Sequence, residues 1–139
     1  MKHVLEHAKI TSLTRRLDFD KAHGAIRVRD DFVQIRVNPA ANHLKDKQSC
    51  EFREVRLGIV VSKKFGNSVE RNRFKRIVRF ALREVIENVD FSGDIIVLPR
   101  NMAKNAKSTD IVNSLYGLFE RAKRKFRMIT SIDGQKDSN

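Results

Sequence analysis

The spacing of apolar residues changes from about 2 to about 3.6 at Gly66, and this change decides how the middle of the chain folds. Before it, residues 55–62 alternate, which predicts a strand with Leu57, Ile59 and Val61 on one face. After it, apolar residues recur every three or four positions and predict a helix over 68–89. The apolar stripe of this helix contains Phe74, Ile77, Val78, Ala81, Leu82, Val85, Ile86 and Val89.

The start of this helix also has recognisable capping residues. Asn67 or Ser68 is placed to cap the first turn, and the Glu70 carboxylate suits the positive end of the helix dipole. An almost wholly apolar strand over 94–99 follows the helix. Residues 55–99 therefore form a predicted strand–helix–strand crossover.

The remaining elements are predicted from weaker patterns. We expect a short helix near 17–23, ended by Gly24, and a strand over 31–37 whose buried face is Val33, Ile35 and Val37. A polar connection runs over 38–54. Ser108 is expected to cap a last helix with apolar positions Ile111, Leu115, Leu118, Phe119, Ala122 and Phe126. We predict a single α+β domain over 1–139, a small mixed sheet with helices packed on it, with flexible ends at 1–12 and 131–139.

Charge is the feature of the composition that indicates function. The 139 residues include 29 Lys and Arg against 17 Asp and Glu, a net charge of +12. The segment 53–83 holds ten basic and two acidic residues, and 100–127 holds eight and two. A polyanion is therefore the expected partner. One cysteine, Cys50, excludes a disulfide framework, and no apolar run nears the ~18 residues of a membrane span, so we expect a cytoplasmic protein.

The predicted helix carries a row of cations beside its apolar stripe. At 100° per residue, Lys75, Arg76, Arg79 and Arg83 lie on one face, Arg73 lies further round and Arg71 lies near the helix start. Arginine pairs with phosphate through two parallel hydrogen bonds. The alternative is a solvated face with ion pairs, but acids at the required spacing are few.

The predicted sheet has an open face that suits a single-stranded nucleic acid. With the apolar residues buried on the other side, this face presents Phe32, Gln34, Arg36 and Arg56. An aromatic ring stacks a base, and guanidinium groups neutralise its phosphate. The alternative for Phe32 is ordinary core packing.

The run from Arg56 to Arg79 resembles the signature of the bacterial ribonuclease P protein subunit. It contains a strand ending in Ser62-Lys63-Lys64, a Gly66-Asn67 turn, and then Arg71-Asn72-Arg73 and Lys75-Arg76 on a helix. The resemblance implies a fold similar to domains of a small-subunit ribosomal protein and of elongation factor G. It also implies a left-handed crossover, whereas the general rule favours a right-handed one.

Proteins of that family bind a catalytic RNA and help it remove the 5′ leader of precursor transfer RNA. The RNA and its Mg²⁺ ions do the chemistry, so no catalytic residue and no metal ligand is assigned to the protein, which is expected as a monomer bound 1:1 to the RNA. The residues predicted to bind the catalytic RNA are Lys63, Lys64, Arg71, Asn72, Arg73, Lys75, Arg76, Arg79 and Arg83. The resemblance also implies a leader-binding cleft formed by Phe19, Phe32, Gln34, Arg36 and Arg56, with Lys64 beside it.

The sequence departs from the family pattern at three positions. Ser68 replaces a usual alanine, Phe80 stands where a polar residue is common, and His23 stands near the usual place of a second aromatic residue. For Phe19, the alternative to a role in the leader-binding cleft is ordinary core packing.

Three other functions compete with this one. Autonomous RNA cleavage is disfavoured because the four histidines are scattered, and because Asp18 and Asp20 suit a helix start while Asp30 and Asp31 suit a turn. A structural or chaperone-type RNA-binding protein, such as a ribosomal protein, and a DNA-binding protein remain open.

Overall fold

The computed structural model describes residues 8–12, 26–39 and 53–137. Four strands come first: β1 (Ala8–Ser12), β2 (Ile26–Arg29), β3 (Val33–Pro39) and β4 (Arg53–Ile59). A short 3₁₀ turn, η1 (Lys63–Phe65), leads into the helix α3 (Ser68–Ile86). The strand β5 (Gly93–Pro99), a second turn η2 (Ala103–Asn105) and the helix α4 (Ser108–Asp137) complete the fold.

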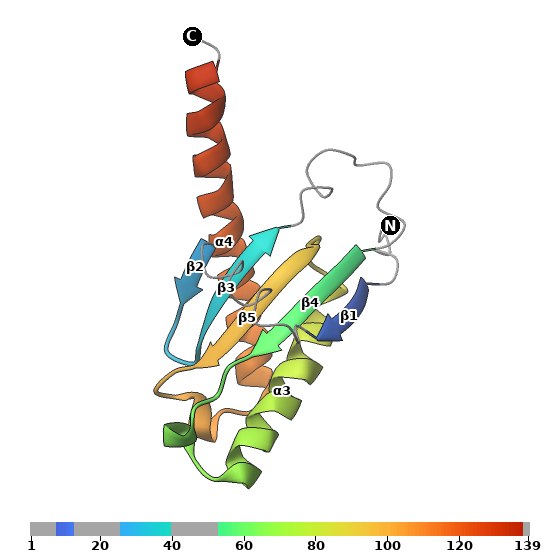
Figure 1. Cartoon of the computed structure of the whole chain (residues 1–139), viewed down its shortest axis with the longest axis vertical. Helices are drawn as coiled ribbons and strands as arrows, with labels where there is room; N and C mark the ends of the chain where they lie inside the picture. Colours follow the sequence, from blue (N-terminus) through green and yellow to red (C-terminus); the bar gives the residue numbers. More distant parts are fainter. Residues whose placement is uncertain (1–7, 13–25, 40–52, 138–139) are drawn as a thin grey trace.

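The five strands form one mixed sheet in the order β1-β4-β5-β3-β2. β4 is parallel to β1 and β5, whereas β3 is antiparallel to β5 and β2. Both helices lie on the same side of this sheet (Figure 1), so the described part of the chain has two layers. In Figure 1, β4 and β5 point downward with the helices behind them and β5 to the left of β4, which makes the β4–α3–β5 crossover left-handed. The implied hand is confirmed, and the fold departs from the general right-handed rule.

The hydrophobic core lies between the sheet and the two helices. The predicted strand face of Val33, Ile35 and Val37 is buried, and so is almost all of the predicted α3 stripe, with Ile77 half-buried. From α4 the core receives Ile111, Leu115, Leu118, Phe119 and Ala122. Because large side chains from every layer meet here, this packing fixes where α3 presents its opposite, polar face.

Two edge strands were not predicted. β1 lies in what was expected to be a flexible end, and it pairs in parallel with β4, with Ile10 opposite Val55. β2 has only one buried side chain, Val28, and it pairs with β3. The side chains of Arg121 and Lys125 on α4 donate to the β2 carbonyls of Arg29 and Arg27, both at 2.9 Å. Short edge strands are stabilised by such neighbours, so their own pattern is weak.

The predicted boundaries need smaller corrections. α3 ends at Ile86 rather than near 89, and β3 includes the first two residues of the predicted polar connection. α4 extends to Asp137 and Ser108 is its first residue rather than its cap; the Asp110 carboxylate instead accepts the Lys107 amide at 2.9 Å. The predicted helix at 17–23, with Phe19 and His23, lies outside the described residues, as does most of the 38–54 connection.

Candidate nucleic-acid interface

A capping box fixes the start of α3. The Asn67 side chain accepts the Glu70 amide at 2.9 Å, and the Glu70 carboxylate accepts the Asn67 amide at 3.1 Å. The hydrogen bond from Asn67 and the Lys104 ammonium, 3.5 Å away, hold the pKa of Glu70 below its ordinary value and outweigh desolvation. The predicted cap at Asn67 is confirmed, and it sets the direction in which the cation-rich helix leaves the sheet.

Gly66 is needed because this capping box lies against it. A Cβ atom at this position would stand 2.5 Å from the Glu70 Oε1 atom and 2.9 Å from its Cδ. Its φ of 164° is extended backbone that any residue adopts, so space rather than backbone strain selects glycine. The Gly-Asn turn of the signature is therefore explained by close packing around Glu70.

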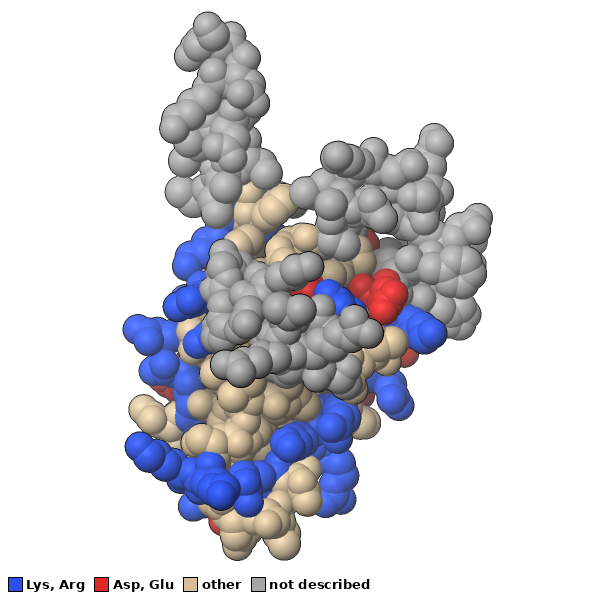
Figure 2. All heavy atoms as spheres, in the orientation of Figure 1, with Lys and Arg blue, Asp and Glu red and all other residues tan. Residues whose placement is uncertain are grey.

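Most predicted RNA-binding residues are exposed on η1 and on one side of α3. Lys63, Lys64, Asn72, Arg73, Arg76, Arg79 and Arg83 are exposed, while Arg71 and Lys75 are half-buried. The Arg71 guanidinium lies back on the helix start, 3.4 Å from the Asn67 carbonyl and from the Ser68 hydroxyl. In the part of the chain that the structure describes, none of the α3 cations has a salt bridge. Figure 2 shows Lys and Arg gathered over the end of the molecule where η1 and α3 begin.

The sheet register brings three of the predicted leader-binding residues to one face of the sheet, the predicted open face. This face is partly covered, because Ile96 and Asp94 of β5, which lie on it, are 1% and 7% exposed. Gln34 and Arg36 of β3 lie opposite Leu98 and Ile96 of β5, and Arg56 of β4 lies on the same face. All three predicted residues are half-buried. This is the face away from both helices, so it is separate from the α3 cations.

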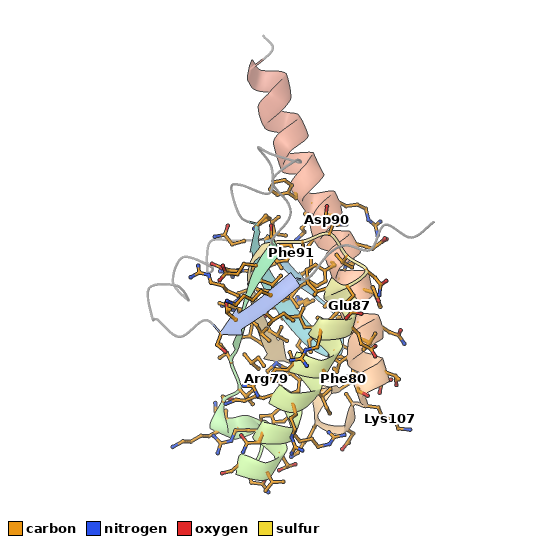
Figure 3. All side chains as sticks on the ribbon, turned by 90° about the vertical axis from the view of Figure 1, so that its right-hand side faces the viewer. Arg79, Phe80, Glu87, Asp90, Phe91 and Lys107 are labelled. Atoms are coloured by element: carbon orange, nitrogen blue, oxygen red, sulfur yellow. The ribbon has the colours of Figure 1, made fainter. Side chains whose placement is uncertain are left out.

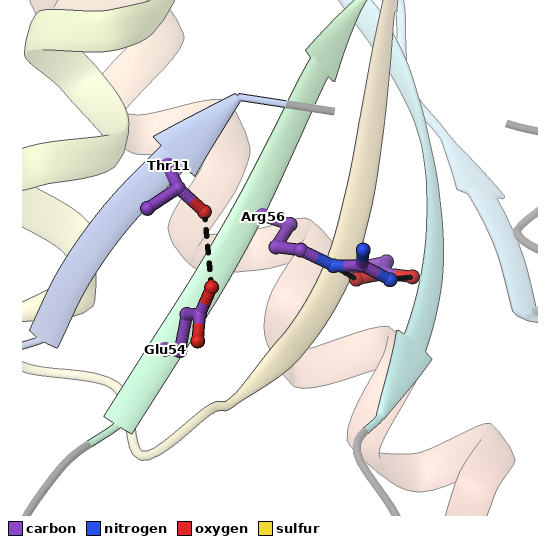
Figure 4. Close-up of polar contacts among 4 residues, drawn as sticks. Thr11, Glu54 and Arg56 are labelled. Carbon is purple, nitrogen blue, oxygen red and sulfur yellow. Dashed lines mark hydrogen bonds and ion pairs between the residues drawn. The ribbon is translucent and has the colours of Figure 1, made fainter. Parts of the chain in front are cut away.

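Arg56 forms an ion pair that its sequence neighbours do not indicate. Its Nε and Nη2 atoms donate to the two carboxylate oxygens of Asp94, at 2.7 and 2.8 Å (Figure 4). The Asp94 side chain is 10% exposed and that of Arg56 is 36% exposed. At the edge of the same face, the Thr11 hydroxyl donates to Glu54 at 3.2 Å (Figure 4). The open face thus carries carboxylates as well as guanidinium groups.

Phe32 is held by the turn between β2 and β3. The Asp30 carboxylate accepts the amides of Phe32 and Val33 at 2.8 and 3.0 Å, which confirms the predicted turn. The half-buried ring packs against the core and lines a groove of about 370 Å³ with Asp110, Asn113 and other residues. Part of this ring therefore serves packing, as the alternative for Phe32 proposed.

Neither a cluster of metal ligands nor a membrane-spanning helix is found within the described residues. Among the described residues, no three His, Cys, Asp or Glu side chains gather as metal ligands would. Asp18 and Asp20 lie outside those residues. No helix in the described ranges is long and apolar enough to cross a membrane.

Similarity to known proteins identifies the family. The sequence pattern of a family described as Ribonuclease P matches residues 8–123, most of the chain. The chain belongs to the ribonuclease P protein family. A "Ribonuclease P protein component" from an Exiguobacterium species is 43% identical over 68 residues, which are 49% of this chain and 59% of that relative. Another from Desulfosudis oleivorans is 42% identical over 72 residues, 52% of this chain and 60% of the relative. The matched part spans about three fifths of these curated relatives.

Solved structures of ribonuclease P proteins have the same fold. The RNase P protein of Staphylococcus aureus is 29% identical, with a TM-score of 0.64, and the match covers 81% of this chain and 94% of that one. The RNase P protein from Thermotoga maritima is 24% identical with the same TM-score, covering 79% of this chain and 96% of the other. The predicted α+β fold of the ribonuclease P protein type is confirmed.

Proposed function

We propose that this chain is the protein subunit of ribonuclease P, which binds a catalytic RNA and assists removal of the 5′ leader from precursor transfer RNA. The observation that carries the proposal is the row of exposed cations on α3, which has no salt bridge within the described residues. Membership of the ribonuclease P protein family supports the proposed RNA partner.

The α3 cations would bind the catalytic RNA by neutralising its phosphates. The row from Arg76 to Arg83 spans about 10 Å at 1.5 Å per residue, a length that matches successive phosphates of an RNA backbone. The capping box and the buried stripe hold these side chains on one rigid helix. RNA binding therefore requires little ordering of the protein backbone, which favours affinity.

The open face of the sheet would hold the single-stranded leader. Gln34 offers an amide for base edges, and Arg36 and Arg56 offer guanidinium groups for phosphates or for stacking. Because Asp94 already binds Arg56, this guanidinium contributes less net charge than the α3 cations. We assign Asp94 a positioning role, because its carboxylate holds the Arg56 guanidinium that is predicted to contact the leader.

The chemical step would belong to the RNA and to the Mg²⁺ ions that it binds. Three of the described carboxylates have other partners: Asp30 accepts backbone amides, Asp94 binds Arg56, and Asp110 accepts the Lys107 amide. Their arrangement does not fit a magnesium site built by the protein. The protein would act in the cytoplasm as a monomer bound 1:1 to its RNA.

Reconstitution at low Mg²⁺ concentration tests this function. The full chain alone should not cleave precursor transfer RNA, the catalytic RNA alone should cleave it slowly, and the mixture should cleave it fast. An unchanged cleavage rate and substrate affinity in the mixture would refute the proposal. Equal binding to unrelated structured RNA without a rate effect would favour a chaperone-type or ribosomal protein, and preference for duplex DNA would favour a DNA-binding one.

A further inference from the structure

A groove between α3 and the start of α4 is not explained by the family signature. Its volume is about 740 Å³, within the range of pockets that bind small molecules. One stripe of α3 forms one wall, with Val69, Arg73, Arg76 and Phe80 at spacings of four, three and four, and Ile77 beside them. Lys107 and Ser108 form the other wall, where α4 begins.

The groove exposes apolar surface in the middle of a cation-rich region. Phe80 is 53% exposed and Val69 is 73% exposed. Figure 3 shows that Phe80 and Arg79 leave α3 on different sides, with Phe80 on the side of Lys107. An exposed aromatic ring costs free energy in water, and such rings mark binding sites when polar groups surround them.

The charged groups of the groove are all cations. Arg73, Arg76 and Lys107 line it, and no lining residue is acidic. One Nη2 donor of Arg73 binds the Ala106 carbonyl at 3.1 Å, which holds that side chain across to the loop before α4. A guanidinium has five N–H donors, so the others stay available to a ligand. Neither Arg76 nor Lys107 has a salt bridge within the described ranges.

We infer that this groove binds one unpaired nucleotide of the structured RNA partner, with its base on the Phe80 ring and its phosphate on Arg73, Arg76 and Lys107. An aromatic ring beside guanidinium groups is the combination that holds a base and its phosphate. A purely apolar partner would leave three cations without counter-charge in the interface. The inference rests on the proposed function, because it names the kind of nucleotide that α3 takes when it binds the catalytic RNA.

Substitution of Phe80 tests the stacking directly. Phe80→Leu keeps an apolar side chain but removes the ring, and it should raise the Kd for the catalytic RNA of the same organism about tenfold. Phe80→Trp keeps a stacking ring, and its Kd should stay within about threefold of the native chain. Met102→Ala is the matched control, because Met102 is 54% exposed but lies outside the groove. Its Kd should not change, and all three variants should show the native urea midpoint.

Phe80→Trp also gives a spectroscopic readout, because the chain has no other tryptophan. Addition of the catalytic RNA should quench its fluorescence as a base stacks on the indole.

A native Kd for Phe80→Leu, or an unquenched tryptophan, overturns the nucleotide site. If Arg79→Ala, outside the groove, still weakens RNA binding in that case, the proposed function stands without the site. If neither Arg79→Ala nor Phe80→Leu changes RNA affinity, α3 does not bind the RNA and both fail. A fluorescence change that follows protein concentration without RNA would mean self-association and would also overturn the site.

Discussion

The Arg56–Asp94 ion pair gives the sharpest test of how the open face of the sheet works. The change is a double-mutant cycle of Arg56→Gln, Asp94→Asn and the double variant, which keeps a polar side chain at each position and removes each charge in turn. Loss of one partner of a fully buried pair costs about 3–5 kcal/mol. The Arg56 side chain is 36% exposed, so solvent screens part of this interaction. We expect a coupling free energy of about 2 kcal/mol in urea unfolding at neutral pH.

The same variants separate positioning from RNA contact. Asp94→Asn releases a guanidinium from its counter-ion, so affinity for precursor transfer RNA should rise relative to leaderless transfer RNA although the protein is less stable. Arg56→Gln should lower that leader-dependent affinity. A coupling below about 0.5 kcal/mol, the level of an exposed pair, would refute the argument that this carboxylate holds Arg56 in place. If the fully folded Asp94→Asn variant bound the leader more weakly than the native chain, the argument that Asp94 offsets the charge of Arg56 would be refuted.

Four further results are expected. Gly66→Ala should lower the free energy of unfolding by about 1 kcal/mol, because the new Cβ displaces Glu70 from the capping box. Gly117→Ala should raise it by about 0.5–1 kcal/mol, because beyond its chain neighbours and the nearby backbone of its own helix no atom lies within 4 Å of the added Cβ; urea unfolding measures both. Because the folded pKa of Glu70 lies below 4.5, its charge stabilises the fold above that pH, and the stability difference from Glu70→Gln should shrink as the pH falls below 4.5 through the folded pKa. In a salt titration, the slope of log affinity for RNA against log salt concentration should be about −3.5 for about five phosphates. Arg79→Ala should reduce the magnitude of this slope by about 0.7. Arg121→Ala should lower the free energy of unfolding by about 1 kcal/mol, because it removes the hydrogen bond to the Arg29 carbonyl. A change of more than about threefold in the Kd for RNA would show that Arg121 also contacts RNA.

The parts of the fold that were predictable are those whose burial repeats along the sequence. Phe74, Val78 and Leu82 recur at helical spacing because one side of α3 faces the core, and this pattern survives without tertiary information. The Asn67 cap and the Asp30 turn are local hydrogen bonds between residues two or three apart, so they too were visible in the sequence. β1 was not visible, because its pairing with β4 joins residues far apart in the chain and its own five residues show no strong alternation.

The residues of the candidate site were also predictable only where a local pattern arranges them. The cations of α3 were predictable because a single helix arranges them, and their exposure follows from the buried stripe opposite. The partner of Arg56 lies 38 residues away, and only the β4–β5 register brings the two together. The available signal was one carboxylate at the start of an otherwise apolar strand, Asp94, whose burial requires a partner. The groove at Phe80 needed the packing of α4 against α3, which no local pattern encodes.

These contacts change what the net charge of +12 means for binding. Two basic segments looked equivalent in the sequence, but their side chains have different partners. On α4, Arg121 and Lys125 donate to carbonyls of β2, and before it Lys104 faces the Glu70 carboxylate, so part of this second segment stabilises the fold. On α3, Arg76 and Arg79 are exposed and have no salt bridge within the described residues. Because a cation without a protein partner gains most from a phosphate, the affinity for RNA should come mainly from α3.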